Sequence, residues 1–313
     1  MTRQQYNAVI IGGGAAGLSA AVALGRARRS VLVVDAGEPR NAPASHMHGF
    51  LSRDGMNPAE LLRVGRLEAE GYGVEVHRGH ALSVSPGSPG CTGFTVELAE
   101  RPPVRARRVL LATGLRDDLP DIPGLAERWG KDALHCPYCH GWEVRDERIA
   151  VIGTSHMAAH HALLWRQWTP NLTFIAHSAT PDAEQSAQLA ARGISVVHAQ
   201  VAGLDVRGDR LTGLHLHNGA TLPFDAVTVG ARFHPVLPRI DGLAPVDHMS
   251  GMGTHVPVDA MGRTAVPGIW AAGNLANPMA NVIAAAAEGS LAAHMLNMDL
   301  ITEDTDLAVR AAS

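Results

Sequence analysis

An apolar run at residues 8–11 leads directly into a glycine-rich loop at residues 12–17. A continuous apolar run of this kind is typical of a strand that is buried on both faces of a parallel sheet. The next residues, 18–25, predict a helix, and residues 31–34 predict a second buried strand. A strand, a glycine loop, a helix and a second strand within about 30 residues predict one βαβ unit of an α/β fold.

The glycines of this loop have separate tasks, which together predict a phosphate site. Gly12 permits the tight turn, Gly14 lets the backbone approach a pyrophosphate, and Gly17 lets the helix pack closely on the sheet. The pyrophosphate would lie at the helix N-terminus, where free N–H groups and the helix dipole favour an anion. We therefore expect Ala15 and Ala16, which lie in the same loop, to contact the cofactor.

A carboxylate closes the second predicted strand. Asp35 follows the loop at about 20 residues, the distance at which an acid can bind an adenosine ribose hydroxyl. The loop and the acid together predict a bound dinucleotide, but they do not distinguish FAD from NAD. A glycine-rich packing turn without a ligand is the alternative interpretation.

The same architecture recurs more weakly in the middle of the chain. Residues 149–152 predict a strand, Gly153 a turn, residues 157–167 a helix and residues 172–175 another strand. With a length of 313 residues, the chain is long enough for two domains. We therefore expect two nucleotide-type units, one after the other.

Turn residues predict the remaining elements of the first unit. Residues 109–114 predict a buried strand that ends in a tight turn, and stretches rich in proline and glycine at residues 85–90 and 101–103 predict hairpin turns of a small antiparallel insert. Residues 117–124 contain two prolines and predict a crossover between the units.

The end of the chain predicts a helix and a mobile tail. Residues 267–274 predict a strand and a turn, after which Asn277 can cap a helix and Pro278 suits its first position. We expect this helix to run to about Asn297. The acidic tail after Asp299 is expected to be mobile.

The composition excludes several classes of protein. The formal net charge is −4 and the charges are interspersed, so we expect no nucleic-acid or membrane partner. No signal-peptide pattern precedes the first strand, and no apolar stretch is long enough to span a bilayer. The three cysteines are too few for a disulfide scaffold and indicate a reducing cytoplasm. Cys91 lies in a turn-rich segment and receives no role.

Two cysteines form a CxxC motif. The spacing of Cys136 and Cys139 allows a disulfide to close across one turn of chain. Half a zinc site completed by His135 or His140 is one alternative, but the chain has no second CxxC, and both histidines adjoin a cysteine. A chance pair of buried thiols is the other alternative. We predict a redox-active pair and no metal.

In order and spacing, these motifs resemble the low-molecular-weight thioredoxin reductases over nearly the whole chain. The resemblance rests on the loop at residues 12–17, on Ala112-Thr113-Gly114, on the CxxC motif at residues 136–139, and on residues 268–274. It implies an α/β fold of two Rossmann-like domains of the FAD/NAD-binding type, with the second inserted into the first. It also implies FAD as the cofactor and a homodimer.

The resemblance implies domain boundaries as well. Residues 1–117 and 242–313 would form a discontinuous FAD-binding domain. Residues 118–241 would form a domain of the pyridine-nucleotide type that carries the CxxC motif.

Further contacts with FAD follow from the same resemblance. Arg40 and Asn41 would reach the cofactor, and His48 would lie where the chain passes the isoalloxazine ring; a solvated loop is the alternative for each. The helix expected near Asn277 would point its positive end at the flavin pyrimidine ring. The remaining cofactor contacts implied are Ala81, Ala112, Thr113, Gly114, Gly273 and Asn274.

Three features depart from the thioredoxin reductases. Ser155 stands where the NADPH loop of that family has glycine, which compromises the approach of the backbone to a pyrophosphate. Residues 176–182 contain no arginine, whereas the family grips the NADPH 2′-phosphate with arginines in this stretch. His140 replaces the acidic proton donor that usually follows the second cysteine.

These departures, with the string at residues 136–143, resemble the dithiol oxidases of gliotoxin and holomycin biosynthesis, especially the bacterial holomycin type. The resemblance implies a small-molecule dithiol as substrate, and dioxygen as the acceptor with release of hydrogen peroxide. It assigns Cys136 to the substrate and Cys139 to the flavin. His140 would be the base, because an imidazole takes a thiol proton at about pH 7. His135 is an alternative base. The alternative interpretation of His140 is a surface histidine without a catalytic role.

Two other functions compete with dithiol oxidation. One is a disulfide reductase of the thioredoxin reductase type that is fed by NADPH or another electron donor. The other is a non-catalytic FAD-binding redox sensor or scaffold, which the absence of interaction tails disfavours.

Overall fold

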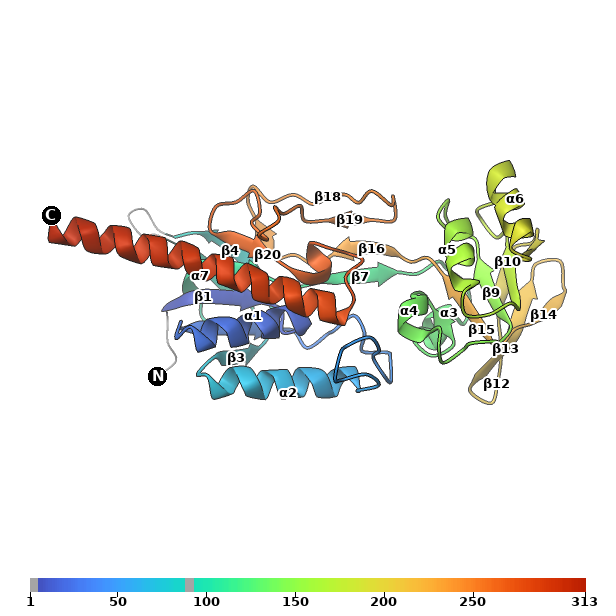
Figure 1. The fold of residues 1–313 in the computed structure, drawn as a ribbon, viewed down its shortest axis with the longest axis horizontal. Helices are drawn as coiled ribbons and strands as arrows, with labels where there is room; N and C mark the ends of the chain where they lie inside the picture. The colour runs from blue at the N-terminus through green and yellow to red at the C-terminus, as the bar shows by residue number, and fades with distance from the viewer. Residues whose placement is uncertain (1–4, 88–92) are drawn as a thin grey trace.

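The computed structural model describes residues 5–87 and 93–313. Two lobes are joined by a narrow two-stranded connection, and the lobe with the C-terminal helix also contains the start of the chain (Figure 1). Residues 88–92, which include Cys91 and part of the predicted turn at residues 85–90, lie outside the described part.

The first lobe is built on an eight-stranded sheet whose core is parallel. Ile11 lies opposite both Val34 and Leu111, so the loops that follow these three strands leave the same edge of the sheet. The parallel strands, in spatial order, are β3 (Glu75–Arg78), β2 (Val31–Asp35), β1 (Gln5–Ile11), β6 (Val104–Leu111) and β20 (Ile269–Ala271).

An antiparallel insert extends this sheet, as predicted. Strands β4 (Ala81–Pro86) and β5 (Phe94–Leu98) pair with each other in antiparallel fashion, and β5 pairs in the same way with the start of β6. The short strand β17 (Arg239–Ile240) runs parallel to β4. The chain therefore returns to the first sheet just before residue 242, where the second predicted segment of the FAD-binding domain begins.

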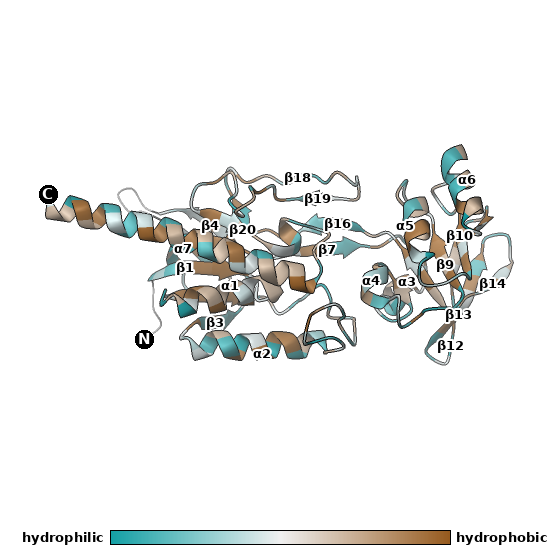
Figure 2. Cartoon of the chain, in the orientation of Figure 1, coloured by the Kyte–Doolittle hydropathy of each residue, from teal (hydrophilic) through white to brown (hydrophobic). Residues whose placement is uncertain are grey.

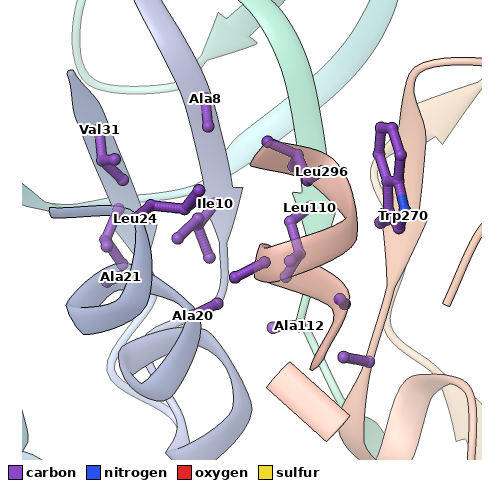
Figure 3. Close-up of a cluster of buried hydrophobic side chains, with 14 of the residues drawn as sticks. Ala8, Ile10, Ala20, Ala21, Leu24, Val31, Leu110, Ala112, Trp270 and Leu296 are labelled. Carbon is purple, nitrogen blue, oxygen red and sulfur yellow. The ribbon is translucent and has the colours of Figure 1, made fainter. Parts of the chain in front are cut away.

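The first lobe is covered by the helices α1 (Ala15–Arg26), α2 (Pro58–Gly71) and α7 (Val282–Ala312). Helix α7 packs on α1 so closely that a Cβ on Gly289 would lie 2.0 Å from the carbonyl oxygen of Ala16. Figure 3 shows the core beneath these helices, in which Ile10, Leu24 and Leu296 are fully buried. Burial of such side chains is the main source of stability here.

The second lobe contains a parallel five-stranded sheet in the order β11-β10-β9-β15-β8. In Figure 2, β1 of the first lobe is hydrophilic at its start and hydrophobic towards its end, whereas α6 at the edge of the second lobe has a mixed colouring. The strands of the second sheet are β8 (Ala133–Leu134), β9 (Ile149–Ile152), β10 (Leu172–Ile175), β11 (Ser195–Val197) and β15 (Ala226–Val229).

Short helices and an antiparallel sheet complete the second lobe. The helices are α3 (Leu125–Arg128), α4 (Pro137–His140), α5 (Ala158–Trp165) and α6 (Ala183–Ala191). The antiparallel sheet consists of β12 (Val201–Arg207), β13 (Arg210–Leu216) and β14 (Thr221–Pro223).

Antiparallel strands β7 (Leu115–Asp118) and β16 (Arg232–Pro235) connect the lobes. After β16, the chain forms a hairpin from β18 (Val246–Asp247) and β19 (Thr254–His255), which extends alongside the connection (Figure 1). The 3₁₀ turn η1 (Gly273–Leu275) follows β20. In the described part of the chain, every helix is too short or too polar to cross a bilayer.

The predicted start of the C-terminal helix is wrong by about one turn. Asn281, not Asn277, is the N-cap, and its side chain accepts a hydrogen bond from the backbone N–H of Ala284. Asn277 is engaged elsewhere, because its amide nitrogen donates to Glu288 at 2.7 Å. Pro278 therefore lies in a turn before the helix and not at its first position.

The predicted mobile tail is also wrong, because α7 continues to Ala312. Its acidic side chains pair with arginines of the first lobe: Glu303 with Arg107 at 2.9 Å and Asp304 with Arg29 at 2.8 Å. Leu300, on the same stretch, is fully buried. These long-range contacts hold a segment that composition alone suggests is mobile.

Candidate active site

The first glycine loop joins β1 to α1. Gly12 has φ +107°, and a Cβ there would lie 2.3 Å from the carbonyl oxygen of Ala112. A Cβ on Gly17 would lie 1.9 Å from the carbonyl oxygen of Gly12, so both positions require glycine for packing. At Gly14, the N-cap of α1, no described atom lies within 4 Å of the Cβ position, and no side chain caps the helix. The first N–H groups of α1 therefore lack a side-chain cap, and a helix end of this kind suits an anion such as a pyrophosphate.

Asp35 braces this loop from the neighbouring strand. Its carboxylate accepts a hydrogen bond from the N–H of Gly13 at 3.0 Å and from Arg66 at 3.1 Å. A Cβ on Gly13 would lie 2.6 Å from the Cγ of Asp35, so Gly13 is a functional glycine that the prediction omitted. The unbroken run of three glycines was the signal that could have identified it.

The loops after β6 and β20 meet the glycine loop. Thr113 Oγ1 is buried without a hydrogen-bond partner in the described part of the chain, as expected of a group that awaits a ligand. Gly273 packs on Ala16, since a Cβ on Gly273 would lie 2.9 Å from that methyl group. Gly114 has φ +69° and turns the chain towards β7. The loop, Asp35 and Thr113 thus form a cradle that fits the pyrophosphate and adenosine of FAD.

Two other predicted cofactor residues have structural contacts. The side-chain amide of Asn274 donates to the carbonyl oxygens of Pro278 and Ala280, at 3.2 and 2.8 Å, and so shapes the turn before α7. Ala81 begins β4, close to the adenosine end of the cradle, because the N–H of nearby Gly79 donates to the backbone oxygen of Asp35 at 2.9 Å.

Arg40 is held by the protein, in a place that the prediction did not anticipate. Its guanidinium forms a bidentate ion pair with Asp117 of β7, at 2.8 and 2.7 Å, and donates to the carbonyl oxygen of Pro278 at 3.4 Å. The neighbouring Asn41 is half-buried, and its carbonyl oxygen accepts the N–H of Ala44 in a turn. Arg40 therefore ties three segments together at the base of the connection between the lobes.

His48 bridges the two lobes. Its Nδ1 lies 3.2 Å from Asp54 in the first lobe, and its Nε2 lies 3.3 Å from Oε1 of Glu143 in the second lobe. Nearby, a Cβ on Gly130 would lie 2.9 Å from the Cβ of Pro43. The segment that contains Arg40 and His48 thus rests against the region of the CxxC motif.

The two cysteines of this motif are half-buried free thiols at helix α4. Cys136 is the N-cap, and its carbonyl oxygen accepts the N–H groups of Cys139 and His140 at 3.1 and 3.2 Å. Pro137 occupies the first helical position, where its missing N–H costs nothing. The turn therefore holds the two sulfur atoms on one side of the chain.

The fold distinguishes the two sulfur atoms electrostatically. A hydrogen bond from the Cys139 thiol lowers the pKa of Cys136 to about 7, helped by the N–H groups of Cys139 and Tyr138 and by the charge of Arg40, against the opposing effect of burial. The same hydrogen bond, followed by burial, raises the pKa of Cys139. Cys136 is therefore the thiolate of the reduced pair at neutral pH.

The two candidate bases differ in their contacts. Both ring nitrogens of His140 are buried without a partner among the described residues, and burial lowers its pKa while the carboxylate of Glu143 opposes this shift. His135 is held by the backbone, with Nδ1 at 3.0 Å from the carbonyl oxygen of Val229, and burial lowers its pKa as well. Both imidazoles are thus neutral at pH 7, and His140 has both nitrogens free for a ligand.

Aromatic side chains beside the cysteines were not predicted as part of the site. Tyr138, between the cysteines, is 69% exposed and meets the ring of Trp168 edge-on at 5.3 Å. Trp142 is 66% exposed, with the guanidinium of Arg145 4.2 Å above its ring. Tyr138 and Trp142 thus expose apolar surface in the segment that carries the two cysteines.

The second glycine loop is tightly packed within its own lobe at Gly153. A Cβ on Gly153 would lie 2.7 Å from the ring of Phe174, and the carbonyl oxygen of Gly153 accepts the N–H groups of Ser178 and Ala179 at 2.9 Å.

Across residues 5–87 and 93–313, no group of three or more His, Cys, Asp or Glu side chains could hold a metal ion.

A glycine-loop lobe joined to a lobe with a cysteine pair defines a flavin-dependent oxidoreductase. The chain belongs to the pyridine nucleotide-disulphide oxidoreductase family, whose model matches residues 6–289. Its relatives are FAD-binding flavoproteins, and FAD is its cofactor, as predicted.

Individual relatives match over almost the whole chain. The solved structure of HlmI is 45% identical with a TM-score of 0.93, and the likeness covers 100% of this chain and 98% of that one. "Thioredoxin reductase tcpT" of Claviceps purpurea is 30% identical over 96% of both chains. "Thioredoxin reductase sirT" of Leptosphaeria maculans is 28% identical over 98% of this chain and 97% of its own. The predicted resemblance to thioredoxin reductases and the predicted fold class are confirmed.

Proposed function

We propose that this protein is an FAD-dependent dithiol oxidase that closes a disulfide in a small-molecule natural product. The observation that carries the proposal is the contrast between the two sites through which electrons could enter, the second glycine loop and the cysteine pair. The second glycine loop has Ser155 in place of a glycine and no arginine at residues 176–182. The cysteine pair, by contrast, directly precedes His140, whose imidazole has no hydrogen-bond partner among the described residues. Thiols rather than a nucleotide are then the electron donor.

The reaction starts from the oxidised Cys136–Cys139 disulfide. His140 takes the proton of the first substrate thiol, and the resulting thiolate attacks Cys136, which breaks the cysteine disulfide and releases Cys139. The second substrate thiolate then attacks the substrate sulfur of this mixed disulfide and displaces Cys136. Because the pKa of Cys136 is lowered to about 7, it is a good leaving group. The substrate has lost two electrons and two protons, and the cysteine pair holds the electrons.

The cofactor cradle completes the cycle. Gly12, Gly14, Gly17, Asp35 and Thr113 are the residues that would hold FAD. When bound, FAD would supply a two-electron acceptor for the reduced pair, and dioxygen would be the terminal oxidant that is reduced to hydrogen peroxide. The charge of Arg40 favours the thiolate that forms at Cys136.

A disulfide reductase of the thioredoxin reductase type is the second candidate, because tcpT and sirT carry that name. Against it, the identity to HlmI, 45%, exceeds the 30% and 28% found for those two proteins. The degenerate second glycine loop also disfavours NADPH as the electron donor.

Anaerobic flavin spectra separate the two candidates. We expect a small dithiol to bleach the flavin of the FAD-loaded enzyme, NADPH to leave it oxidised, and air to restore the colour with one peroxide per disulfide. Rapid bleaching by NADPH, or reduction of a thioredoxin-like protein at a useful rate, would overturn the proposal in favour of the reductase.

We also infer that the enzyme is a cytoplasmic homodimer. Its resemblance to thioredoxin reductases and its few cysteines support this inference. Sedimentation of the FAD-loaded protein tests the dimer, and a monomer at micromolar concentration would contradict it.

A further inference from the structure

The hairpin of β18 and β19 belongs to the part of the chain that has returned to the first lobe, yet its tip reaches the second (Figure 1). In the tip, residues 248–253, Gly251 and Met252 approach the second lobe. A Cβ on Gly251 would lie 3.2 Å from Cε1 of His156, in the second glycine loop. The tip is therefore packed on the loop where a nucleotide would be expected.

The place of contact is the natural ligand crevice of this sheet. In open α/β sheets, ligands bind outside the carboxyl ends of the strands, where neighbouring strands connect in opposite directions. In the order β11-β10-β9-β15-β8, this point lies between β9 and β15. Gly153 follows β9 directly and Gly230 follows β15, so these two glycines mark the two sides of the crevice.

Met252 lies at this crevice. The Cε of Met252 lies 3.1 Å from the point that a Cβ on Gly230 would occupy, and Oγ of Ser155 lies 3.9 Å from the same point. The methionine side chain and the loop residue Ser155 thus converge on one position between the strands. A pyrophosphate that approached the N-terminus of α5 from this crevice would meet Met252 first.

The tip is anchored in this position. The N–H of Phe233 in β16 donates to the carbonyl oxygen of Met252 at 3.0 Å, and the rings of Phe233 and His248 meet edge-on at 5.6 Å. The N–H of His248 donates to the carbonyl oxygen of Gly253 at 2.8 Å. A Cβ on Gly253 would lie 2.0 Å from the carbonyl oxygen of Phe233, so only glycine allows this close approach.

We propose that the hairpin tip, residues 248–253, is a specificity element that occupies the nucleotide crevice of the second lobe and excludes pyridine nucleotides. The consequence, that thiols must supply the electrons, rests on the proposed dithiol oxidase function. The exclusion itself is a property of the structure and is measured separately. Ser155 in place of a glycine, and the lack of arginines at residues 176–182, weaken the binding of a nucleotide. The hairpin tip, by contrast, occupies the space that the nucleotide would need.

Binding of NADH tests the proposal, because NADH lacks the 2′-phosphate for which residues 176–182 offer no arginine. The FAD-loaded full-length chain with Ser155→Gly is the reference, and NADH affinity is measured by calorimetry. Adding Met252→Ala is expected to tighten NADH binding by about tenfold or more, because the nucleotide then no longer has to displace the methionine side chain from the crevice. Adding Gly253→Ala, which pushes the tip off Phe233, is expected to act in the same direction.

Met249→Ala in the same Ser155→Gly background is the matched control. Met249 lies in the tip but is 97% exposed, so its removal leaves NADH affinity unchanged. Equal affinity in the reference and in both the Met252→Ala and Gly253→Ala variants, including absence of measurable binding in all three, would overturn the proposal. Dithiol-driven peroxide release, followed in parallel, reports on the proposed function; its absence would refute that function and leave the NADH comparison intact.

Discussion

The thiol of Cys136 has a pKa lowered to about 7, first by the hydrogen bond from Cys139, with a smaller contribution from Arg40. Arg40 is fixed for this task by its bidentate pairing with Asp117. We expect Arg40→Gln to move the midpoint for alkylation of reduced Cys136 to higher pH, because the thiolate loses a positive neighbour. The pH dependence of alkylation measures this midpoint. Arg40→Lys keeps the charge and should shift it less; an unchanged midpoint in Arg40→Gln would contradict the assignment.

Substitution of the two histidines decides which of them is the base. Burial lowers the pKa of His140, so the imidazole stays neutral and able to accept a proton to below pH 6.5. We expect His140→Asn to lower dithiol turnover near neutral pH by about 10²–10⁴-fold, with partial recovery as rising pH ionises the substrate thiol. Steady-state pH profiles show both effects. If His135→Asn produces this signature and His140→Asn does not, His135 is the base.

At the scale of the element, the turn from β1 into α1 contains glycines that packing requires and one glycine, Gly14, that we assign to cofactor binding. A Cβ on Gly17 would strike the backbone at 1.9 Å, whereas Gly14 has φ −76° and open space around its Cβ position. We expect Gly14→Ala to leave the unfolding free energy of the apoprotein almost unchanged but to reduce FAD content. Gly17→Ala should destabilise the apoprotein itself by at least about 1–3 kcal/mol.

Denaturant unfolding of the apoprotein and the flavin absorbance of the purified variants measure these two properties. A Gly14→Ala protein that retains full FAD content would show that no group approaches the loop at this position.

For the whole molecule, the pairing of His48 with Glu143 is one of the contacts that keep the cysteine lobe against the flavin lobe. We expect Glu143→Gln to slow flavin bleaching by a dithiol by up to about fivefold, since a partly exposed pair contributes 0.2–1 kcal/mol. Alkylation of Cys136 should stay unchanged. Asp54→Asn removes the other partner of His48 within its own lobe and is the control. Stopped-flow absorbance measures the rate, and equal slowing in both variants would refute a bridging role.

Local patterns in the sequence predicted the elements that carry the candidate site. The strands, the glycine loop with Asp35, and the Cys136–Cys139 turn each depend on residues close to one another in the chain. Apolar runs, glycines and a CxxC spacing therefore identify them without knowledge of the fold. For the same reason, Ser155 in the second loop could be recognised as a departure from a nucleotide site.

Contacts between distant segments were decided by the tertiary structure alone. The sequence shows Asn277 as a good cap and residues after Asp299 as a polar tail, but Glu288 engages the former, and arginines such as Arg29 hold the latter in a helix. Likewise, Arg40 meets Asp117, and the hairpin tip meets the second glycine loop, only after the lobes are in place. Local sequence determines which conformations and reactive groups are available; folding determines which of the distant charges and surfaces become neighbours.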